Sequence, residues 1–393
     1  MYRIINFIKE FIRETDKFLL VLCTVTSAYG LLMVYSATKP TLSDGAVFSR
    51  DFRTMLIAVG AGLVFAIVIS LLDYEFIIKL WPLIGLFCVG IMIVTLIWGK
   101  APPARPDARS WLVIGDTGFY LQPSELVKIG FIITFGFHLD AVKDTLDKLG
   151  TMFLLCVHAA IPVLLVIITG DAGSALIFIL MFVGMMFMAG VKLRYFAAGA
   201  AIVAAISPLV WIYALKDLQK NRILALFYPE LYPAVIYQQD MGIKAIGSGG
   251  FWGSGLFKGT YTQSSLVPEN QNDMIFSVIG EELGFVGAIT AIVLITLIIA
   301  RIINTGKKSR DNSTSNMCYG MAIMLAAQVI INIGMALKLF PVVGITLPFF
   351  SAGGSSNLSV YLGIGLILSI YRYNQTKQLD NLRLIGIRTP FTE

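Results

Sequence analysis

The chain has 393 residues, of which 57% are hydrophobic and only 14% are charged, and its mean hydropathy is +0.79. Soluble domains carry about 25% charged residues, so this composition excludes an ordinary soluble protein and indicates lipid as the solvent. The net charge of +6 does not indicate a nucleic-acid partner, because the basic residues lie between apolar runs, where they set membrane topology.

Ten apolar runs are long enough to form membrane-spanning helices, which need about 20 mostly apolar residues each. They lie at 18–37, 55–72, 76–98, 126–142, 152–169, 174–190, 195–215, 275–303, 318–338 and 357–373. We therefore predict an all-α polytopic membrane protein with a single ten-helix domain over residues 18–373. A charged amphipathic segment, 1–17, is expected along the cytoplasmic membrane surface, and 374–393 form a cytoplasmic tail.

Lysine and arginine set the orientation of these helices. They concentrate before the first run and after the fourth, sixth, eighth and tenth, which places both termini in the cytoplasm. Two outer segments are long, 99–125 and 216–274, and the second is a predicted large extracellular loop between helices 7 and 8. Both carry cations where the topology rule expects few. Either long loops escape the rule, or these cations bind an anion such as a phosphate.

Cysteine and histidine usage argues against metal and disulfide chemistry. The four cysteines and two histidines lie within or at the end of apolar runs. Their spacing fits neither a zinc site nor a disulfide framework, so we predict no metal site built on histidine.

A polar cluster opens the fourth run. Gln122 is followed by Pro123, which suits the first turn of a helix, and by Ser124 and Glu125, whose oxygens can meet the open amides there. Lys128 lies one turn further, where a charge inside an apolar helix costs roughly 3 kcal/mol and normally has a partner. A structural pair with Glu125, three residues earlier, is the alternative to a role in binding.

Asp171 lies in the glycine-containing turn between the fifth and sixth runs. Aspartate is strongly preferred as a helix N-cap, and this position begins the sixth helix. A pair with Lys128 inside the bundle is the other structural interpretation. Both interpretations make Asp171 a structural residue.

A glycine-rich segment follows Lys244 in the large outer loop and includes Ser248, Gly249 and Gly250. Successive glycines allow backbone amides to approach an anion closely. The segment is not a nucleotide-binding loop, because no strand precedes it and no Gly-Lys-Ser/Thr closes it. A flexible connector is the alternative.

Asp273 lies where this loop enters the eighth run, four residues after Glu269. A carboxylate at that position can act as a general base on a sugar hydroxyl, or it can cap the helix. Further along, Glu281 and Glu282 cannot both face lipid, so at least one faces the bundle interior.

The last motif, 347–356, is an uncharged segment rich in Pro, Gly and Ser. It precedes the tenth run and is expected to fold back into the protein. Its hydroxyl groups, including that of Ser351, are predicted to line a cavity.

Together these segments resemble the SEDS family (shape, elongation, division and sporulation), represented by RodA, FtsW and SpoVE. The matching motifs occur in the family's order at 108–111, 122–128, 170–176, 237–250, 268–276 and 347–356. The sequence departs from the family pattern at Asn272, Met274, Ser254, Ala352 and Thr169. None of these departures removes the aspartate at 273.

The resemblance implies a peptidoglycan glycosyltransferase that polymerises lipid II, a disaccharide pentapeptide on undecaprenyl pyrophosphate, at the outer face of a bacterial cytoplasmic membrane. Asp273 falls on the family's catalytic aspartate and is the expected general base. Substrate contacts are expected from Arg109, Trp111, Gln122, Ser124, Glu125, Lys128, Lys244, Ser248, Glu269 and Ser351. Structural roles are expected for Asp171, Glu281, Glu282, Gly249 and Gly250.

The resemblance also implies a class B penicillin-binding transpeptidase as partner. It favours a RodA-like role in elongation and leaves a role in division as the alternative. It leaves a divalent cation, Mg or Mn, open as a cofactor, without a ligand set in this sequence. Two other functions stay open. One is a flippase or transporter of lipid-linked precursors, gated by charges such as Lys128, Asp171 and Glu282. The other is a non-catalytic scaffold for the penicillin-binding protein.

Overall fold

A computed structural model describes residues 14–42, 46–101, 108–114 and 119–384 of the chain. Most of the predicted interfacial segment 1–17 and the last residues of the tail 374–393 lie outside these ranges. The side chains of 376–384 are also outside the description.

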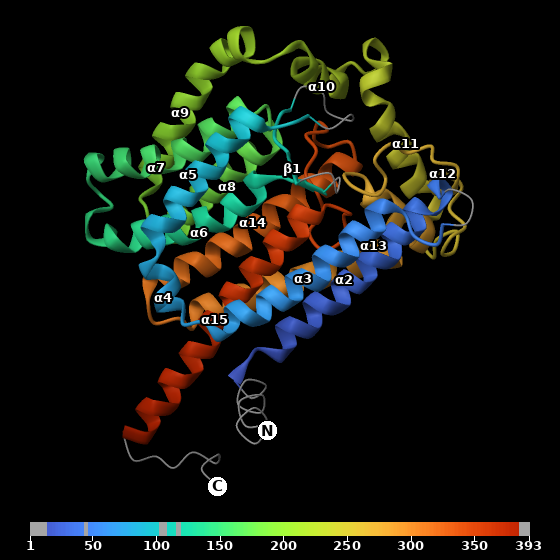
Figure 1. Cartoon of the computed structure of the whole chain (residues 1–393). Helices are drawn as coiled ribbons and strands as arrows, with labels where there is room; N and C mark the ends of the chain where they lie inside the picture. The colour runs from blue at the N-terminus through green and yellow to red at the C-terminus, as the bar shows by residue number, and fades with distance from the viewer. Residues whose placement is uncertain (1–13, 43–45, 102–107, 115–118, 385–393) are drawn as a thin grey trace.

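Ten helices correspond one to one with the ten predicted runs (Figure 1). They are α2 Lys17–Thr38, α3 Arg50–Leu71, α5 Trp81–Trp98, α6 Pro123–Ala141, α7 Leu149–Ile168, α8 Ala172–Met188, α9 Leu193–Leu209, α13 Ile275–Lys307, α14 Asn312–Ala336 and α15 Gly354–Leu384. Among the described residues, eight helices are long and apolar enough to cross a membrane. The other two are α8, with 17 residues, and α6, which carries Glu125, Lys128 and Asp140. The chain is a multi-pass membrane protein, as predicted.

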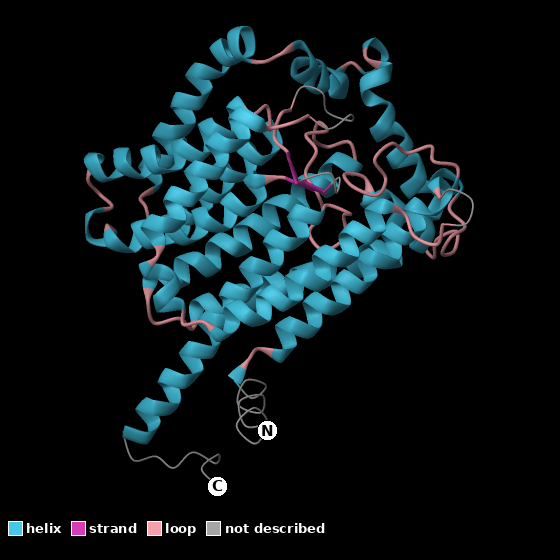
Figure 2. Ribbon diagram, in the orientation of Figure 1, coloured by secondary structure: helices cyan, strands magenta, loops and turns pink. Residues whose placement is uncertain are grey.

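Shorter elements connect these helices. They are η1 Lys39–Thr41, α4 Tyr74–Lys79, β1 Leu112–Ile114, β2 Phe119–Leu121, η3 Lys143–Thr145, η4 Val210–Ala214, α10 Asp217–Phe227, η5 Pro229–Leu231, α11 Pro233–Gly249 and α12 Thr260–Gln263. The predicted large loop 216–274 is therefore largely helical. β1 and β2 pair antiparallel in a small hairpin (Figure 2).

The hairpin and helices α10, α11 and α12 lie at one end of the bundle, here called the loop face. Helix α2 begins, and helix α15 ends, at the opposite face (Figure 1). The loop face is the one that the topology rule places outside the cell.

Helices α14 and α15 form the centre of the bundle, with 67% and 78% of their spans buried in the protein. Glycines let α15 approach its neighbour α3 closely. A Cβ at Gly62 would lie 2.8 Å from Tyr361, and one at Gly365 would lie 2.9 Å from Ala66. Small residues at such contacts are typical of membrane helix pairs, because dispersion contacts replace the hydrophobic effect there.

Helix α9 contrasts with this core. None of its span is buried in the protein, and Figure 1 shows it apart from the central helices on its way to α10. Its apolar side chains are therefore mostly exposed, apart from Tyr195 and Phe196 near its start, which pack against the core.

Candidate functional site

Asp273 lies at the loop face, in the short turn that leads into α13. The N-cap position of that helix is Met274, and it has no side-chain hydrogen bond. Asp273 lies one residue before this position, and both roles expected for it, general base or helix cap, stay predictions. Asp273 keeps 9% of its surface exposed, whereas Glu281 and Glu282 have none.

Three hydrogen bonds hold the backbone at residues 271–273, one to each of the three consecutive carbonyl oxygens. The Ala352 amide donates to Gln271 O at 2.9 Å, and the Ser351 hydroxyl donates to Asn272 O at 2.7 Å. The Asn332 side-chain amide donates to Asp273 O at 2.9 Å. Since these donors come from α14 and the loop before α15, the segment 271–273 is held by the centre of the bundle.

The same loop is also bonded to α14 and to α15. Asn332 Nδ2 donates to Ile345 O at 2.7 Å, and Asn357 Nδ2 donates to Ser351 O at 2.8 Å. Ser351 is 1% exposed and its Oγ accepts from the Leu347 amide at 2.8 Å. The hydroxyl of Ser351 therefore both donates and accepts a hydrogen bond within the protein. Its expected contact with substrate stays a prediction.

Backbone strain occurs in both segments that meet at this site. Glu269 and Phe349 have positive φ angles of 54° and 68°, in the left-handed region that favours glycine. The carboxylate of Glu269 accepts from Asn272 Nδ2 at 2.8 Å, and its carbonyl accepts from the Asn272 and Met274 amides. Non-glycine residues in this region persist only where their surroundings over-determine them, which is common at functional sites.

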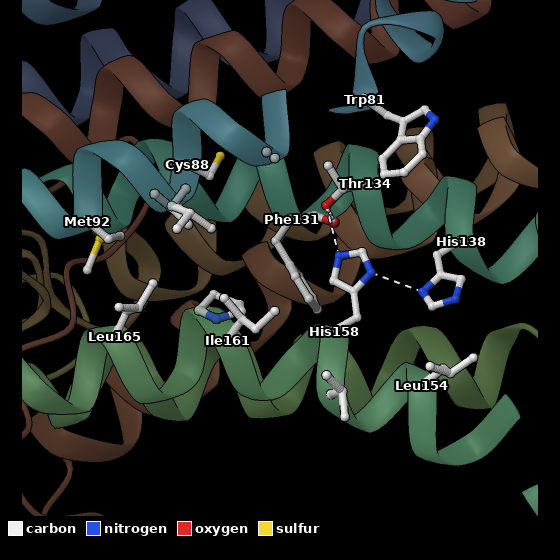
Figure 3. A pocket seen from close by; sticks show the side chains of 16 residues that line it. Trp81, Cys88, Met92, Phe131, Thr134, His138, Leu154, His158, Ile161 and Leu165 are labelled. Atoms are coloured by element: carbon white, nitrogen blue, oxygen red, sulfur yellow. Dashed lines mark hydrogen bonds between the residues drawn. The ribbon is translucent and has the colours of Figure 1, made fainter. Parts of the chain in front are cut away.

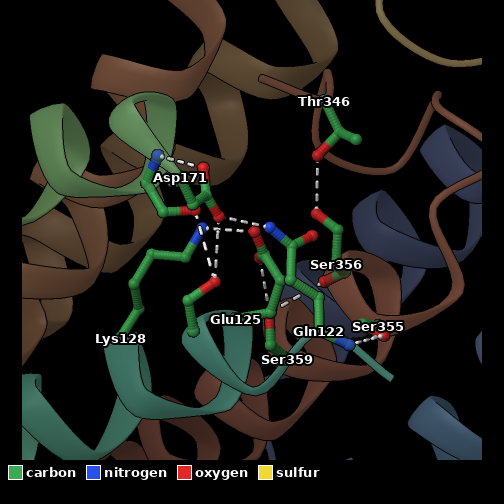
Figure 4. A network of polar contacts seen from close by, with 10 residues as sticks. Gln122, Glu125, Lys128, Asp171, Thr346, Ser355, Ser356 and Ser359 are labelled. Carbon is green, nitrogen blue, oxygen red and sulfur yellow. Dashed lines mark hydrogen bonds and ion pairs between the residues drawn. The ribbon is translucent and has the colours of Figure 1, made fainter. Parts of the chain in front are cut away.

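A second polar cluster lies at the start of α6 (Figure 4). Lys128 is 1% exposed and its Nζ lies 2.7 Å from Glu125 Oε1. Asp171 caps α8 by accepting from the Ser174 amide, and it also accepts from Gln122 Nε2 at 2.6 Å. The structure therefore pairs Lys128 with Glu125, and the alternative pair with Asp171 is wrong.

This cluster is joined to the Asp273 segment through the loop 345–356. The Gln122 amide donates to Ser355 Oγ at 2.9 Å, at the start of α15. Ser124 Oγ donates to Asp171 Oδ2 at 3.3 Å. The buried positions of Ser124, Glu125 and Lys128 give them structural contacts, and their contact with substrate stays a prediction.

Other predicted contact residues are more accessible. Arg109 and Lys244 are exposed, and Trp111 is half-buried beside the hairpin. Ser248 is also exposed, with its hydroxyl donating to Ala245 O in its own helix at 2.7 Å. Arg109 and Lys244 can therefore present positive charge to a ligand at the loop face.

The glycine-rich segment packs against a break in α13, where Gly284 has a φ of 64°. A Cβ at Gly249 would lie 2.0 Å from the Gly280 carbonyl oxygen. The Ser254 amide donates to Glu281 O at 3.0 Å, and the Gly250 carbonyl accepts from Phe285 N at 2.9 Å. These glycines therefore allow the backbone of the segment to contact helix α13 closely. The amide of Ser254 is already hydrogen-bonded and is not available to an anion.

Glu281 and Glu282 both face the protein interior. The sequence predicted this for at least one of them. Glu281 accepts from the Tyr261 and Thr262 amides and from the Thr262 hydroxyl at 2.7–2.9 Å. Glu282 accepts from the Ser36 hydroxyl and from Gln263 Nε2. The two carboxylates anchor α12 and its flanking loop to α13, which supports their expected structural role.

Four polar residues at this face were missed in the sequence. Besides Asn332, they are Gln239, which donates to Met335 O at 2.8 Å, and the ion pair between Lys338 and Asp240 at 2.6 Å. The sequence did contain a signal for Asn332, because a side-chain amide within an apolar run needs a hydrogen-bond partner in the protein interior. The pair between α11 and the end of α14 joins residues 98 positions apart, and no sequence spacing reveals it.

A cavity of about 140 Å³ lies at the loop face and brings together residues of two of the motifs, 108–111 and 170–176. It is lined by Ala108, Gly170, Ala172, Leu215, Gln219, Arg222, Ile223, Pro341 and Val343. Within the described ranges, no group of three or more His, Cys, Asp or Glu side chains could hold a metal ion.

Comparisons with known proteins point in one direction. The family model for FtsW, RodA and SpoVE, described as cell cycle protein, matches residues 16–376. The chain is 32% identical over 368 residues to a probable peptidoglycan glycosyltransferase FtsW of Trichlorobacter lovleyi, covering 91% of this chain and 93% of that protein. It is 28% identical over 363 residues to the peptidoglycan glycosyltransferase MrdB of Escherichia coli, covering 92% and 94%.

Solved structures share the fold. A chain of a peptidoglycan synthase complex that coordinates polymerization and crosslinking has a TM-score of 0.77 at 27% identity, covering 92% of this chain and 98% of that chain. The rod shape determining protein RodA of Thermus thermophilus has a TM-score of 0.67 at 24% identity, covering 92% and 97%.

Proposed function

Since this chain belongs to the FtsW, RodA and SpoVE family of cell cycle proteins, we propose that it is a peptidoglycan glycosyltransferase that extends glycan strands from lipid II. The observation that carries the proposal is the placement of Asp273. Its carboxylate stands at the head of α13 on a backbone whose three consecutive carbonyls are fixed by the bundle centre. Such fixed placement is what a general base requires, because small displacements of a reacting group cost large factors in rate.

In the proposed reaction, the 4-hydroxyl of one sugar attacks the anomeric carbon of another. Asp273 takes the hydroxyl proton as the new C–O bond forms. The bond between the anomeric carbon and the pyrophosphate oxygen breaks, and the undecaprenyl pyrophosphate leaves with the electron pair. Inversion at the anomeric carbon follows from attack opposite the leaving group.

Negative charge on the departing pyrophosphate calls for cations at the loop face. Arg109 and Lys244 are exposed there, and Arg222 lines the cavity of about 140 Å³. We assign the pyrophosphate to Arg109 and Lys244 rather than to Lys128, whose charge is already paired with Glu125 in the interior. A divalent cation, Mg or Mn, stays part of the proposal, as a group that would neutralise charge on the departing pyrophosphate.

The proposal includes topology and partner. The loop face lies outside the cell and both termini lie in the cytoplasm, which the distribution of lysine and arginine supports. The likeness to a chain of a complex for polymerization and crosslinking supports a class B penicillin-binding protein as partner. A RodA-like role in elongation is part of the same proposal.

The test is polymerisation of labelled lipid II by the purified full-length chain in liposomes, with and without the penicillin-binding protein. We expect Asp273→Asn to lower the rate at least about 100-fold. Glu230→Gln is the matched control, because Glu230 is an exposed carboxylate of the same outer region. Movement of lipid II between leaflets without polymer would support the flippase, and neither activity would support the scaffold. Full activity of Asp273→Asn would contradict the proposed base.

A further inference from the structure

A second cavity, of about 340 Å³, lies between α5, α6 and α7 (Figure 3). Its walls are mostly apolar, but three polar side chains are joined within it. His138 Nδ1 lies 3.0 Å from His158 Nδ1, and His158 Nε2 lies 3.2 Å from Thr134 Oγ1. A mainly apolar cavity of this size with a few connected polar groups is typical of a ligand site.

The cavity opens on the flank of the bundle that faces lipid. Leu154, Val157 and Ile161 of α7 line it and are 55%, 40% and 45% exposed. An occupant of such a cavity comes from the bilayer, and an apolar wall of this kind accepts a hydrocarbon chain. The position of the histidines along the bundle indicates which lipid, and which end of it, they contact.

The polar end of the cavity points away from the proposed catalytic face. Helix α6 starts at the loop face, where the Gln122 amide bonds to Ser355. His138 lies in the last turn of the same helix, within about 5 Å of its end at a rise of 1.5 Å per residue. A headgroup that meets His138 therefore belongs to the leaflet opposite Asp273.

The hydrogen bonds allow one arrangement of protons in which this end of the cavity donates. The Thr134 hydroxyl lies 3.4 Å from the Phe131 carbonyl and 3.2 Å from His158 Nε2, and the roles of the histidine nitrogens depend on the tautomer. When Thr134 donates to His158 Nε2, His158 carries its proton on Nδ1 and donates to His138 Nδ1. His138 then carries its proton on Nε2, for which the described residues supply no acceptor, so it can donate to a ligand.

Trp81, which lines the same cavity as His138, and Lys79, which precedes Trp81 by two residues, suit a phosphate-bearing headgroup. Trp81 lines the cavity at the start of α5, and its ring stacks on that of Phe137 at 5.4 Å. Lys79, at the end of α4 and two residues before Trp81, is exposed. Tryptophan and lysine at a helix start are typical of the lipid headgroup region.

We propose that this cavity binds one acyl chain of a phospholipid from the leaflet opposite Asp273, with the lipid phosphate accepting from His138 and facing Lys79. The site is independent of glycosyl transfer. The simpler interpretation is that the two histidines only bond α6 to α7, as polar side chains do in membrane bundles. That interpretation accounts for the short contact between the rings, but not for the apolar cavity beside them, whose wall on α7 is exposed on the flank of the bundle.

The test uses full-length protein in vesicles of phosphatidylethanolamine and phosphatidylglycerol. The probe is a phosphatidylglycerol with a photoreactive diazirine near the end of one acyl chain, and crosslinked peptides are mapped. We expect crosslinks concentrated on α5, α6 and α7. Crosslinks spread evenly over all lipid-facing helices would overturn the proposal.

Two glycines of α5 give a matched pair of variants. A Cβ at Gly85, which lines the cavity, meets only Thr134 at 3.8 Å, and one at Gly90 meets nothing within 4 Å. Gly85→Leu should fill the cavity and lower crosslinking at least about tenfold, because several methylene groups of the lipid are displaced. Gly90→Leu should leave crosslinking unchanged. Equal crosslinking by the two variants would overturn the proposal.

The headgroup is tested by competition between the probe and a diacylglycerol with the same chains. Wild type should prefer the phosphate-bearing lipid by about tenfold, as expected for a hydrogen bond to a charged group. His138→Phe should abolish this preference while the protein stays folded by circular dichroism and size exclusion. If His138→Phe only lowers thermal stability and keeps the preference, the histidines are a structural pair and the headgroup assignment is refuted.

Discussion

Asn332 is the residue whose removal most directly tests how Asp273 is held. Its Nδ2 donates to two buried carbonyls, Asp273 O at 2.9 Å and Ile345 O at 2.7 Å. Asn332→Ala leaves both carbonyls without this donor, at a cost of about 1–3 kcal/mol for each buried group. Asn332 Oδ1 has no partner in the described structure, so its removal offsets part of that cost. We therefore expect the free energy of unfolding to fall by about 2–4 kcal/mol.

The effect on activity follows from position rather than from contact with substrate. Asn332 is fully buried, so its loss should leave the KM for lipid II near that of wild type. A displacement of a reacting group by about 1 Å can cost 100-fold in rate, so we expect kcat to fall by roughly 10- to 100-fold. The assays are polymerisation of labelled lipid II over a range of concentrations and thermal unfolding in detergent.

Asn316→Ala is the control on the same helix. Its Nδ2 makes one long hydrogen bond, 3.4 Å to Gly136 O, so we expect a loss below about 1 kcal/mol and near-normal activity. The reasoning is refuted if Asn332→Ala loses stability as expected but retains wild-type kcat. It is also refuted if KM rises while kcat is kept, because Asn332 would then affect binding rather than the position of the base.

Three further substitutions test other parts of the structure. Ser351→Ala leaves two buried backbone groups unpaired, so we expect about 2–4 kcal/mol lower stability and a lower kcat; a raised KM at unchanged stability would instead identify Ser351 as a substrate contact. Gly249→Ala places a Cβ 2.0 Å from a carbonyl oxygen of α13 and should lower the melting temperature, whereas Gly247→Ala, with nothing within 4 Å, should not. Glu281→Gln replaces one of the two accepting oxygens by an NH2 group, which cannot accept from the donor that faced that oxygen, so trypsin should cleave faster at Lys258; unchanged cleavage would contradict the anchoring role.

The sequence predicted the spans because lipid imposes a simple rule on length and hydropathy. Pro123 and Asp171 also marked two helix starts correctly, since capping and first-turn preferences are local. The donors to residues 271–273 were not predictable, because Ser351 and Asn332 reach them across 79 and 59 positions. Such contacts depend on how helices pack, and periodicity carries no information about them.

The glycine-rich segment shows a second limit of local patterns. Its composition indicated anion binding or flexibility, because both need backbone without side chains. In the structure the same property allows Gly249 to touch Gly280 of α13. Sequence reasoning recognised that something must approach this backbone closely, but only the fold identifies the neighbour as the protein itself.

The three carbonyl bonds at residues 271–273 have a consequence for biogenesis. A membrane chain leaves the ribosome N-terminus first, so Asp273 is synthesised before the side chain of Asn332 and well before the loop at 351–352. During that interval the three donors that hold the backbone at residues 271–273 are absent. The proposed catalytic geometry is therefore complete only after the last transmembrane segment has been inserted, and we expect no activity from a nascent chain that has not reached residue 352.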